Sequence, residues 1–415
     1  MQMRRREFLL GAMAASAVPG MAAVGTGDVS EVEREAFDPS GLIRVKPHLQ
    51  LLGERELGVV WATARPATGT VEWSQDGGKS WTLARNECDG LLTDANDRIH
   101  RLVIGGYDPV RPLAYRVRSK AFKSFGAYKV EYSGEEGTAE GEIGALVPAD
   151  GTLSFAVLND VHQHPEVYKA LAPALSDGLS FTVFNGDILN EVEGEDQIQR
   201  HLLAPLAYCA ARTKAPMWYL RGNHETRGPY ARHLRDYLAL QNGRFYGAVT
   251  LGGVRFVFID TGEDKPDDHW AYSGLTDFDH YVDTETDWLR REFASDAWTK
   301  ARFRIAFMHI PPDADFDNGK KKFAWKPWPD RHARLCKALA AAKPSLVFGA
   351  HMHQRHHDLG IPRRPYPLVV GGGMSVADAE EVRRPTLTRC DVTGSGLRVR
   401  QVTTDGKTVA DFKVG

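Results

Sequence analysis

The chain has 415 residues, 42% of them hydrophobic and 26% charged, and a formal net charge of -2 at pH 7. A chain of this length is too long to pack around one hydrophobic core, so we expect a soluble globular protein of two domains. The near-neutral net charge gives no nucleic-acid-binding signature. The four cysteines form no Cys-x-x-Cys pair and are too few for a disulfide scaffold, which argues against a thiolate zinc site but leaves one disulfide open.

The N-terminus has the layout of an export signal. The arginines at 4–6 precede an apolar run of small residues at 9–24, and the last two arginines, followed by x-Phe-Leu, resemble a twin-arginine signal. The run is interrupted by Pro19 and is shorter than the ~20 apolar residues of a membrane span. We predict that residues 1–24 are a twin-arginine-type signal peptide read by the twin-arginine export machinery. The mature chain would be periplasmic or secreted, without a transmembrane helix; the alternatives are a disordered start or an uncleaved anchor.

Residues 25–42 are polar and acidic and predict a linker. Short runs rich in β-branched and aromatic residues, separated by turn signals, then extend over residues 43–148. Their spacing predicts a small fibronectin- or immunoglobulin-like β-sandwich. Because this region has no cluster of metal-ligating or nucleophilic residues, we expect it to be an accessory domain.

Strands and helices alternate over residues 151–415, which predicts an α/β domain whose apolar strands are covered by helices. The late segments, 366–371 and 386–412, are expected to be antiparallel. Strands are expected at 153–158, 179–184, 216–220, 254–259, 304–308 and 345–349, and helices at 165–175, 195–213 and 331–342.

Two long inserts interrupt this alternation. Residues 261–285 are acidic and aromatic, and residues 312–329 contain Trp325 and Trp328. Loops of this length in a compact domain are usually functional or disordered. We expect both to shape a pocket, but neither contains a motif that identifies a substrate.

Carboxylate, amide and imidazole side chains follow five of the predicted strands. Oxygen and imidazole ligands together suit manganese, iron or zinc, and in an extended Asp-x-His or His-x-His the two side chains point the same way. Each motif alone is more often a turn, cap or surface feature, but five in series predict a metal centre. In chain order they are Asp160-x-His162, Gly186-Asp187, Gly222-Asn223-His224-Glu225, His309 and His351-x-His353.

In combination these motifs resemble the calcineurin-like metallophosphoesterase superfamily, with its pattern D-x-H, G-D-x-x-[DNY], G-N-H-[DE], H and G-H-x-H, over residues 153–355. The resemblance implies a fold of the α/β (α+β) class, a four-layer αββα sandwich. The preceding β-rich region is similar to the N-terminal domain of purple acid phosphatases, with residues 46–50 resembling its opening motif.

The resemblance also implies roles for individual residues. His224 would face the substrate, stabilising phosphoryl oxygens or protonating the leaving alkoxide, and Glu225 would orient His224. A hydroxide bridging the two metals would be the nucleophile. The first metal would be held by Asp160, His162, Asp187 and His353, and the second by Asp187, Asn223, His309 and His351.

The sequence departs from the resembled families at two places. Purple acid phosphatases carry a tyrosine where this chain has Asn190, and a different residue where it has His162, so a purple di-iron centre is not expected. Ala350 replaces the usual glycine of the last motif without removing its histidines.

Four residues are candidates for the rim of the site. His164 and Asn190 lie close to the ligand motifs in sequence. Arg227 would meet either a substrate phosphate or a nearby carboxylate. His269, on the long acidic segment, is either a substrate contact or a surface residue.

These observations predict an exported binuclear-metal phosphoesterase that hydrolyses phosphomonoesters or small phosphodiesters, with two Mn, Fe or Zn ions. The alternative is a non-catalytic surface or binding module that retains the phosphoesterase fold. The sequence does not choose among the metals or name the substrate.

Overall fold

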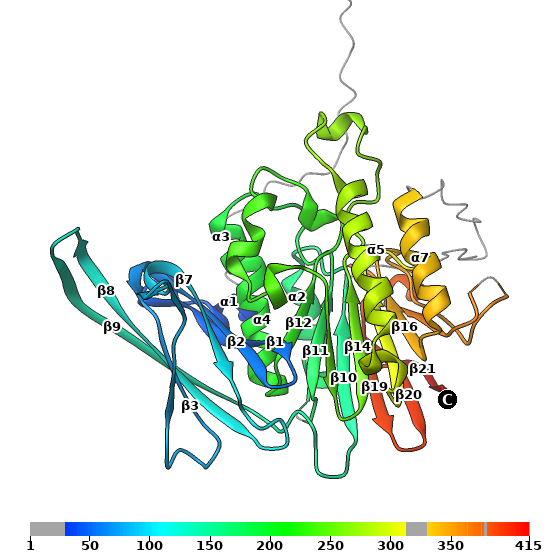
Figure 1. Cartoon of the computed structure of the whole chain (residues 1–415), viewed down its shortest axis with the longest axis horizontal. Coiled ribbons are helices and arrows are strands. Elements are labelled where there is room, and N and C mark those ends of the chain that lie inside the picture. Colours follow the sequence, from blue (N-terminus) through cyan, green and yellow to red (C-terminus); the bar gives the residue numbers. More distant parts are fainter. Residues whose placement is uncertain are drawn as a thin grey trace, which may run out of the picture.

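The computed structural model describes residues 30–414, except for residues 177, 313–329, 363, 375 and 377–379. Its N-terminal part, at the left in Figure 1, is built from strands, as predicted. The strands are β1 (Ile43–Gly53), β2 (Glu56–Thr68), β3 (Thr70–Ser74), β4 (Thr82–Ala84), β5 (Glu87–Cys88), β6 (Leu91–Leu92), β7 (Ala95–Gly105), β8 (Leu113–Phe125) and β9 (Val130–Ile143).

A short helix precedes these strands. The prediction of a linker over residues 25–42 is wrong for α1 (Glu31–Ala36). Ser30 and Glu33 form a reciprocal capping box, which satisfies backbone N–H groups at the helix start. Val32 and Ala36 are buried in the same apolar cluster as helices of the following domain. The helix therefore forms because it is capped and because its apolar face is covered.

The following region contains two sheets. In the first, β10 (Leu153–Leu158), β11 (Phe181–Asn185) and β12 (Met217–Leu220) are parallel, and β10 also pairs with the antiparallel ribbon β19 (Thr386–Thr393), β20 (Gly396–Thr403) and β21 (Thr408–Val414). The second has the order β13-β14-β15-β16-β18-β17. Its strands are β13 (Gly247–Leu251), β14 (Val254–Ile259), β15 (Phe303–Met308), β16 (Leu346–Gly349), β17 (His356–Asp358) and β18 (Leu368–Val370).

The late segments follow the prediction in part. Strands β19, β20 and β21 are antiparallel to their neighbours, as expected. The segment predicted at 366–371 contributes β18, which is antiparallel to β17 but parallel to β16. Strand β18 therefore extends the second sheet and has the same orientation as the central strand β16.

Helices cover the outer face of each sheet (Figure 1). Helices α2 (Pro165–Leu171), α3 (Glu195–Ile198) and α4 (Ala204–Thr213) accompany the first sheet, and α5 (Phe278–Ala294), α6 (Asp296–Thr299) and α7 (Asp330–Ala342) the second. A loop through residue 285 is thus a wrong expectation, because α5 begins at Phe278. Among the described residues, no helix is both long and apolar enough to cross a bilayer.

Alternate residues of the central strands face different layers. Along β10, Phe155 and Val157 belong to the core between the two sheets, whereas Ala156 and Leu158 pack with helices α2 and α4. Strand β14 alternates in the same way between the inter-sheet core and the core that contains α5 and α7. Two helix layers and two sheets make up the expected four-layer αββα sandwich.

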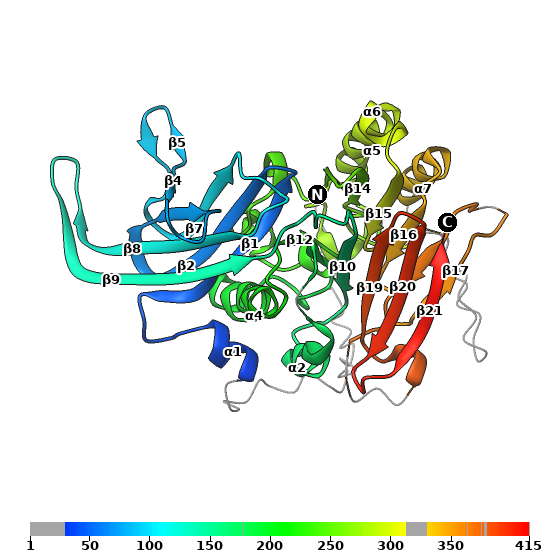
Figure 2. The same ribbon diagram turned by 90° about the horizontal axis from the view of Figure 1, so that it is seen from below.

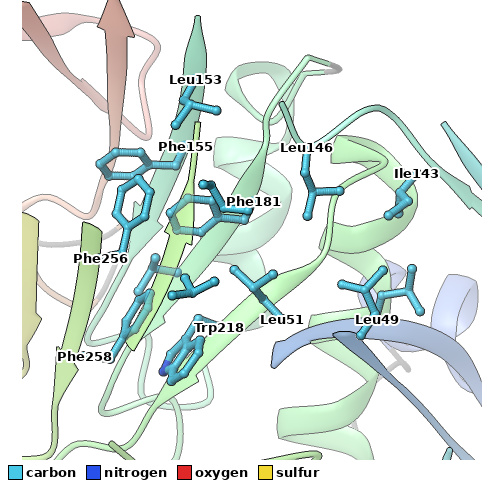
Figure 3. Close-up of a cluster of buried hydrophobic side chains, with 14 of the residues drawn as sticks. Leu49, Leu51, Ile143, Leu146, Leu153, Phe155, Phe181, Trp218, Phe256 and Phe258 are labelled. Atoms are coloured by element: carbon cyan, nitrogen blue, oxygen red, sulfur yellow. The ribbon is translucent and has the colours of Figure 1, made fainter. Parts of the chain in front are cut away.

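Aromatic side chains fill the space between the sheets (Figure 3). The rings of Trp218 and Phe258, from opposite sheets, stack with centroids 3.9 Å apart. Phe155 packs on Phe181 at 5.2 Å and edge-on to Phe256 at 5.6 Å. Each buried phenyl group contributes about 1.5–3 kcal/mol. This layer fixes the two sheets relative to each other, and with them the loops at their ends.

Candidate metal centre

The five motifs lie in the loops after β10, β11, β12, β15 and β16. Strands β10, β11 and β12 are parallel within one sheet, and β14, β15 and β16 within the other. Parallel strands present their carboxyl ends at one edge, where α/β folds bind ligands. Because the sheets pack face to face, both sets of loops contribute to one site.

Tight turns bring the candidate ligands together. The backbone is left-handed, with φ of 50° at Asp160, 48° at His162, 52° at Asp187, 67° at His351 and 50° at His353. This conformation costs roughly 1–2 kcal/mol at a residue other than glycine and concentrates at functional sites. The expectation of extended Asp-x-His and His-x-His segments is therefore wrong, because the side chains converge through turns.

The first donor group contains Asp160, His162, Asp187 and His353, whose ligand atoms all lie within 4.8 Å of one another. His162 Nε2 is 3.0 Å from His353 Nε2 and 3.6 Å from Asp187 Oδ2. His353 Nε2 is 3.5 Å from Asp160 Oδ1. The four nitrogen and oxygen atoms thus form one compact group.

The second donor group contains Asp187, His309 and His351 and shares Asp187 with the first. His309 Nε2 lies 3.1 Å from Asp187 Oδ2, and its Nδ1 donates to Asn185 O at 2.8 Å, which fixes the ring orientation. Asn223 joins this group, because its Oδ1 lies 2.7 Å from His351 Nδ1.

Electrostatics favour a cation at this position. Burial lowers the pKa of His162 to about 3 and that of His353 to about 4, so both rings are neutral at pH 7 and keep a lone pair for a metal. Burial also raises the pKa of Asp160 to about 7. Within the described ranges, imidazoles are the sole ion-pair partners of Asp160 and Asp187. Burial lowers the pKa of His309, but the Asp187 and Asp160 carboxyl groups outweigh it and raise that pKa to about 10. Two buried carboxyl groups beside the neutral rings of His162 and His353 fit a divalent or trivalent metal.

Two glycines allow the loops to approach each other. A Cβ on Gly222 would lie 2.2 Å from Asp187 Oδ1, and one on Gly186 would lie 2.4 Å from His309 Nδ1. Gly186 also has a φ of 81°. Neither position admits a side chain without displacing a candidate ligand.

Glu225 does not orient His224, so that expectation is wrong. Its carboxylate is fully buried and accepts four backbone N–H groups: Asp187 at 3.0 Å, Ile188 at 2.7 Å, Leu189 at 2.8 Å and Gly222 at 2.7 Å. The first three follow β11, and the fourth follows β12. Glu225 therefore ties together the two loops that carry Asp187 and Asn223.

His224 is oriented by the backbone of Asn190. Its Nδ1 donates to Asn190 O at 2.5 Å, and its Nε2 accepts from Arg227 Nη1 at 3.2 Å. These partners define the neutral tautomer, because a carbonyl only accepts and a guanidinium only donates. The side chain of Asn190 meets His162 Nδ1 at 3.2 Å. Asn190, expected at the rim, thus contacts both histidines.

Arg227 meets carboxylates, the second of the two interpretations open for it. Its Nε and Nη2 donate to Glu263 at 2.8 and 2.7 Å, and Nη2 also to Asp264 at 2.9 Å. Arg331, from α7, donates to the backbone oxygens of Glu263 and Lys265. Glu263 and Arg331 belong to no sequence motif. The one signal for them is the acidic pair Glu263-Asp264, which begins four residues after the end of β14.

The other rim candidates lie away from the donor groups. His164 meets Glu166 at 2.8 Å on the surface at the start of α2. His269 accepts from Ala271 N at 3.3 Å and caps a short 3-10 turn. Both contacts are local. Residues 313–329 of the second insert lie outside the described residues.

The comparisons with known proteins agree with this geometry. Residues 153–355 match the model of the calcineurin-like phosphoesterase family. The chain therefore carries a calcineurin-like phosphoesterase domain, and this domain makes it a hydrolase of phosphoric ester bonds. No curated protein matches the chain.

Two solved structures share the fold over most of the chain. A purple acid phosphatase isolated from yellow lupin (Lupinus luteus) seeds is 14% identical, with a TM-score of 0.60 over 88% of this chain and 73% of that one. PhoD is 13% identical, with a TM-score of 0.60 over 91% of this chain and 90% of that one. At such identities the likeness concerns the fold, including the strand-rich N-terminal region.

Proposed function

We propose that the chain is an exported phosphoesterase with two metal ions that hydrolyses phosphomonoesters or small phosphodiesters. The observation that carries this proposal is the pair of buried donor groups that share Asp187. Asp187 would belong to the ligand sets of both ions, as in a two-metal site that activates water for phosphoryl transfer.

The donor atoms divide between the two proposed ions. Carboxylate, amide and imidazole ligands suit manganese, iron or zinc. When bound, the ions would lower the pKa of water to supply a nucleophile and would polarise the phosphoryl group. Asp160, His162, Asp187 and His353 would hold the first ion, and Asp187, Asn223, His309 and His351 the second.

His224 would contact the phosphoryl group, with Arg227 held beside it by Glu263 and Asp264. With Nδ1 donating to Asn190 O, His224 has Nε2 as the nitrogen that would face a substrate, and Arg227 Nη1 lies 3.2 Å from it. A proton on Nε2, in place of the hydrogen bond from Arg227, would make this nitrogen a donor to the phosphoryl oxygens. The same proton would pass to the leaving alkoxide.

A cavity of about 230 Å³ lies beside the Gly222 turn. Arg221 and Thr226, which flank the turn, line it together with Phe278 and Tyr281 of α5. Its described lining includes no candidate metal ligand and not His224, so the proposed substrate class rests on the donor groups and not on this cavity.

The test is metal content and turnover of the variants Asp187→Asn and His309→Ala. With p-nitrophenyl phosphate and its bis-ester as substrates, we expect both variants to lose metal and activity. His269→Ala, on a local surface contact, is the matched control and should retain both. Full activity and metal in the two ligand variants would refute the proposal. Binding of esters by the metal-loaded protein without turnover would favour the non-catalytic alternative.

The proposed export depends on residues 1–24, which lie outside the described residues. Twin-arginine transport moves folded proteins, which suits an enzyme that acquires its metals before export. We expect Arg5→Lys with Arg6→Lys to retain the protein inside the cell, whereas Arg4→Lys should not. Cell fractionation with immunodetection measures this, and normal export of the double variant would contradict it.

A further inference from the structure

The β8–β9 hairpin extends beyond the sheet to which it belongs. Strand β3 pairs with β8 over residues 114–118, and β2 meets β8 at Ala121. Beyond Ala121, strand β8 pairs with β9 alone, ending at Phe125 opposite Val130. Figures 1 and 2 both show this end of the hairpin reaching away from the rest of the molecule. We call residues 122–132 the hairpin tip.

Aromatic side chains are exposed at the hairpin tip. Phe125 is 50% exposed, Tyr132 is 53% exposed and Tyr128 is fully exposed. The ring of Phe122 packs edge-on to Phe125 at 5.0 Å and stacks on Tyr132 at 5.1 Å. A two-stranded ribbon is marginally stable in water by itself, and a contiguous exposed apolar surface marks an interaction site.

The charge at the hairpin tip is positive at its outermost end. Residues 122–130 contain Lys123 and Lys129 and no Asp or Glu. Lys129 pairs with Glu131 at 2.6 Å, whereas Lys123 has no ion-pair partner within the described part of the chain. Acidic residues begin only on the return strand, farther from the turn. The outermost surface therefore combines aromatic rings with an available cation.

A second copy of the chain is a poor fit to this surface. Pairing between two copies would use the exposed edge of β9, which carries Glu131, Glu135 and Glu136 and has glycines at 134 and 137. Charged residues on an edge strand oppose such pairing, and glycine weakens a strand. A narrow convex tip also offers no groove to a partner. A lipid surface requires none.

We propose that the hairpin tip inserts into the headgroup region of a lipid surface that contains anionic lipids. Tyrosine and lysine are enriched at the membrane–water boundary, because one end of each side chain is apolar and the other is wetted. Phe125 and Tyr128 would supply the buried apolar area, and Lys123 would meet a lipid phosphate. The protein would thereby be held at a membrane with its metal centre in the aqueous phase. This proposal does not depend on the catalytic one.

The test places an environment-sensitive fluorophore at the hairpin tip of the full chain. Ala127→Cys, combined with Cys88→Ser, provides the labelling site and keeps every aromatic residue. Leu91→Cys, also combined with Cys88→Ser, provides the matched control position, because Leu91 is an exposed residue at the start of β6. Vesicles of phosphatidylethanolamine and phosphatidylglycerol (3:1) are added, with phosphatidylcholine vesicles for comparison.

We expect a blue shift of the label at 127 with the anionic vesicles and none at 91. Phe125→Ser with Tyr128→Ser should weaken this partitioning at least tenfold, and Lys123→Ser about fivefold for anionic vesicles only. Because the label reports its own surroundings, binding through another segment gives no shift at 127, and that result would overturn the proposal. A shift that instead follows protein concentration without lipid would assign the surface to a second copy.

Discussion

Asn223 and His224 are adjacent in the sequence but make different contacts. The amide oxygen of Asn223 lies 2.7 Å from the His351 ring, within the second donor group. The His224 ring instead lies between Asn190 O and Arg227. These contacts support the proposal that Asn223 binds metal and His224 binds substrate.

This division predicts two distinct failures. Asn223→Ala should lower the metal content, because it removes an oxygen donor from the second group. His224→Ala should retain metal and lower kcat by about 10²–10³-fold, the loss typical of a donor that acts on the transition state. Elemental analysis and steady-state kinetics on the same preparations measure both. Equal loss of metal and rate in the two variants would show that the division is wrong.

Glu225 leads to a prediction about stability. In Glu225→Gln, one acceptor oxygen becomes an NH₂ group that faces two backbone N–H donors. We expect a loss of about 2–4 kcal/mol in the free energy of unfolding, because buried donors are left unsatisfied. Urea unfolding measures it, and Glu166→Gln at an exposed position is the control. A stability equal to that of the control would contradict the assigned role.

The clustering of the candidate ligands was predictable from the sequence because each directly follows an apolar strand, and strand ends meet at one edge. The contacts of Glu225 were not, because the direction of a side chain in a turn depends on φ angles that no motif reports. The same limit explains why extended segments were expected where Asp160 and His162 have left-handed backbone.

At the scale of elements, the segment after β14 connects α7 to the site. Arg331 of α7 holds the backbone at Glu263, and Glu263 holds Arg227, whose Nη1 reaches His224. Both ends of this chain of contacts are fixed by packed secondary structure. Glu263 is therefore a positioning residue for Arg227.

Glu263→Gln tests this role. The amide still accepts one hydrogen bond but loses the charge and the bidentate geometry, so Arg227 is no longer held against His224. We expect kcat/KM to fall by roughly 10- to 100-fold with metal content unchanged, since a small misplacement of a catalytic group has a large effect on rate. Asp268→Asn, an exposed residue of the same segment, should behave like the wild type. Loss of metal in Glu263→Gln would instead indicate a structural role.

Helices α1 and α5 show where local sequence composition fails to predict secondary structure. The acidic residues near α1 indicated a linker, yet a capping box and two buried apolar residues are enough to form the helix when a surface is available to cover them. The first turns of α5 lie in a stretch whose acidic and aromatic composition indicated a loop. In both cases tertiary packing overrides local composition.

At the scale of the whole molecule, the two predicted domains share a sheet. Strand β1 pairs with β2 on one side and, at Gln50 opposite Met217, with β12 on the other. The Gln50 side chain accepts from Ala239 N at 2.7 Å, and Gln241 donates to Leu52 O at 2.5 Å. The N-terminal strands thus continue the sheet that carries the candidate metal ligands Asp160, Asp187 and Asn223.

A shared sheet predicts that the described part of the chain unfolds as one unit, and Gly58 provides a local test. A Cβ on Gly58 would lie 2.2 Å from Ala239 Cβ, across the boundary between the two regions. Overpacking of this kind costs about 1–3 kcal/mol. We expect Gly58→Ala to shift the urea midpoints of fluorescence, circular dichroism and activity together, because coincident transitions are the signature of a single cooperative unit.

Gly53→Ala is the matched control, because a Cβ there meets nothing closer than 3.6 Å. It should leave all three midpoints in place. If Gly58→Ala shifts the fluorescence transition but leaves activity unchanged, the N-terminal strands unfold independently of the catalytic domain. Separate unfolding would mean that the β1–β12 pairing transmits no stability to the loops that hold Asp187 and Asn223.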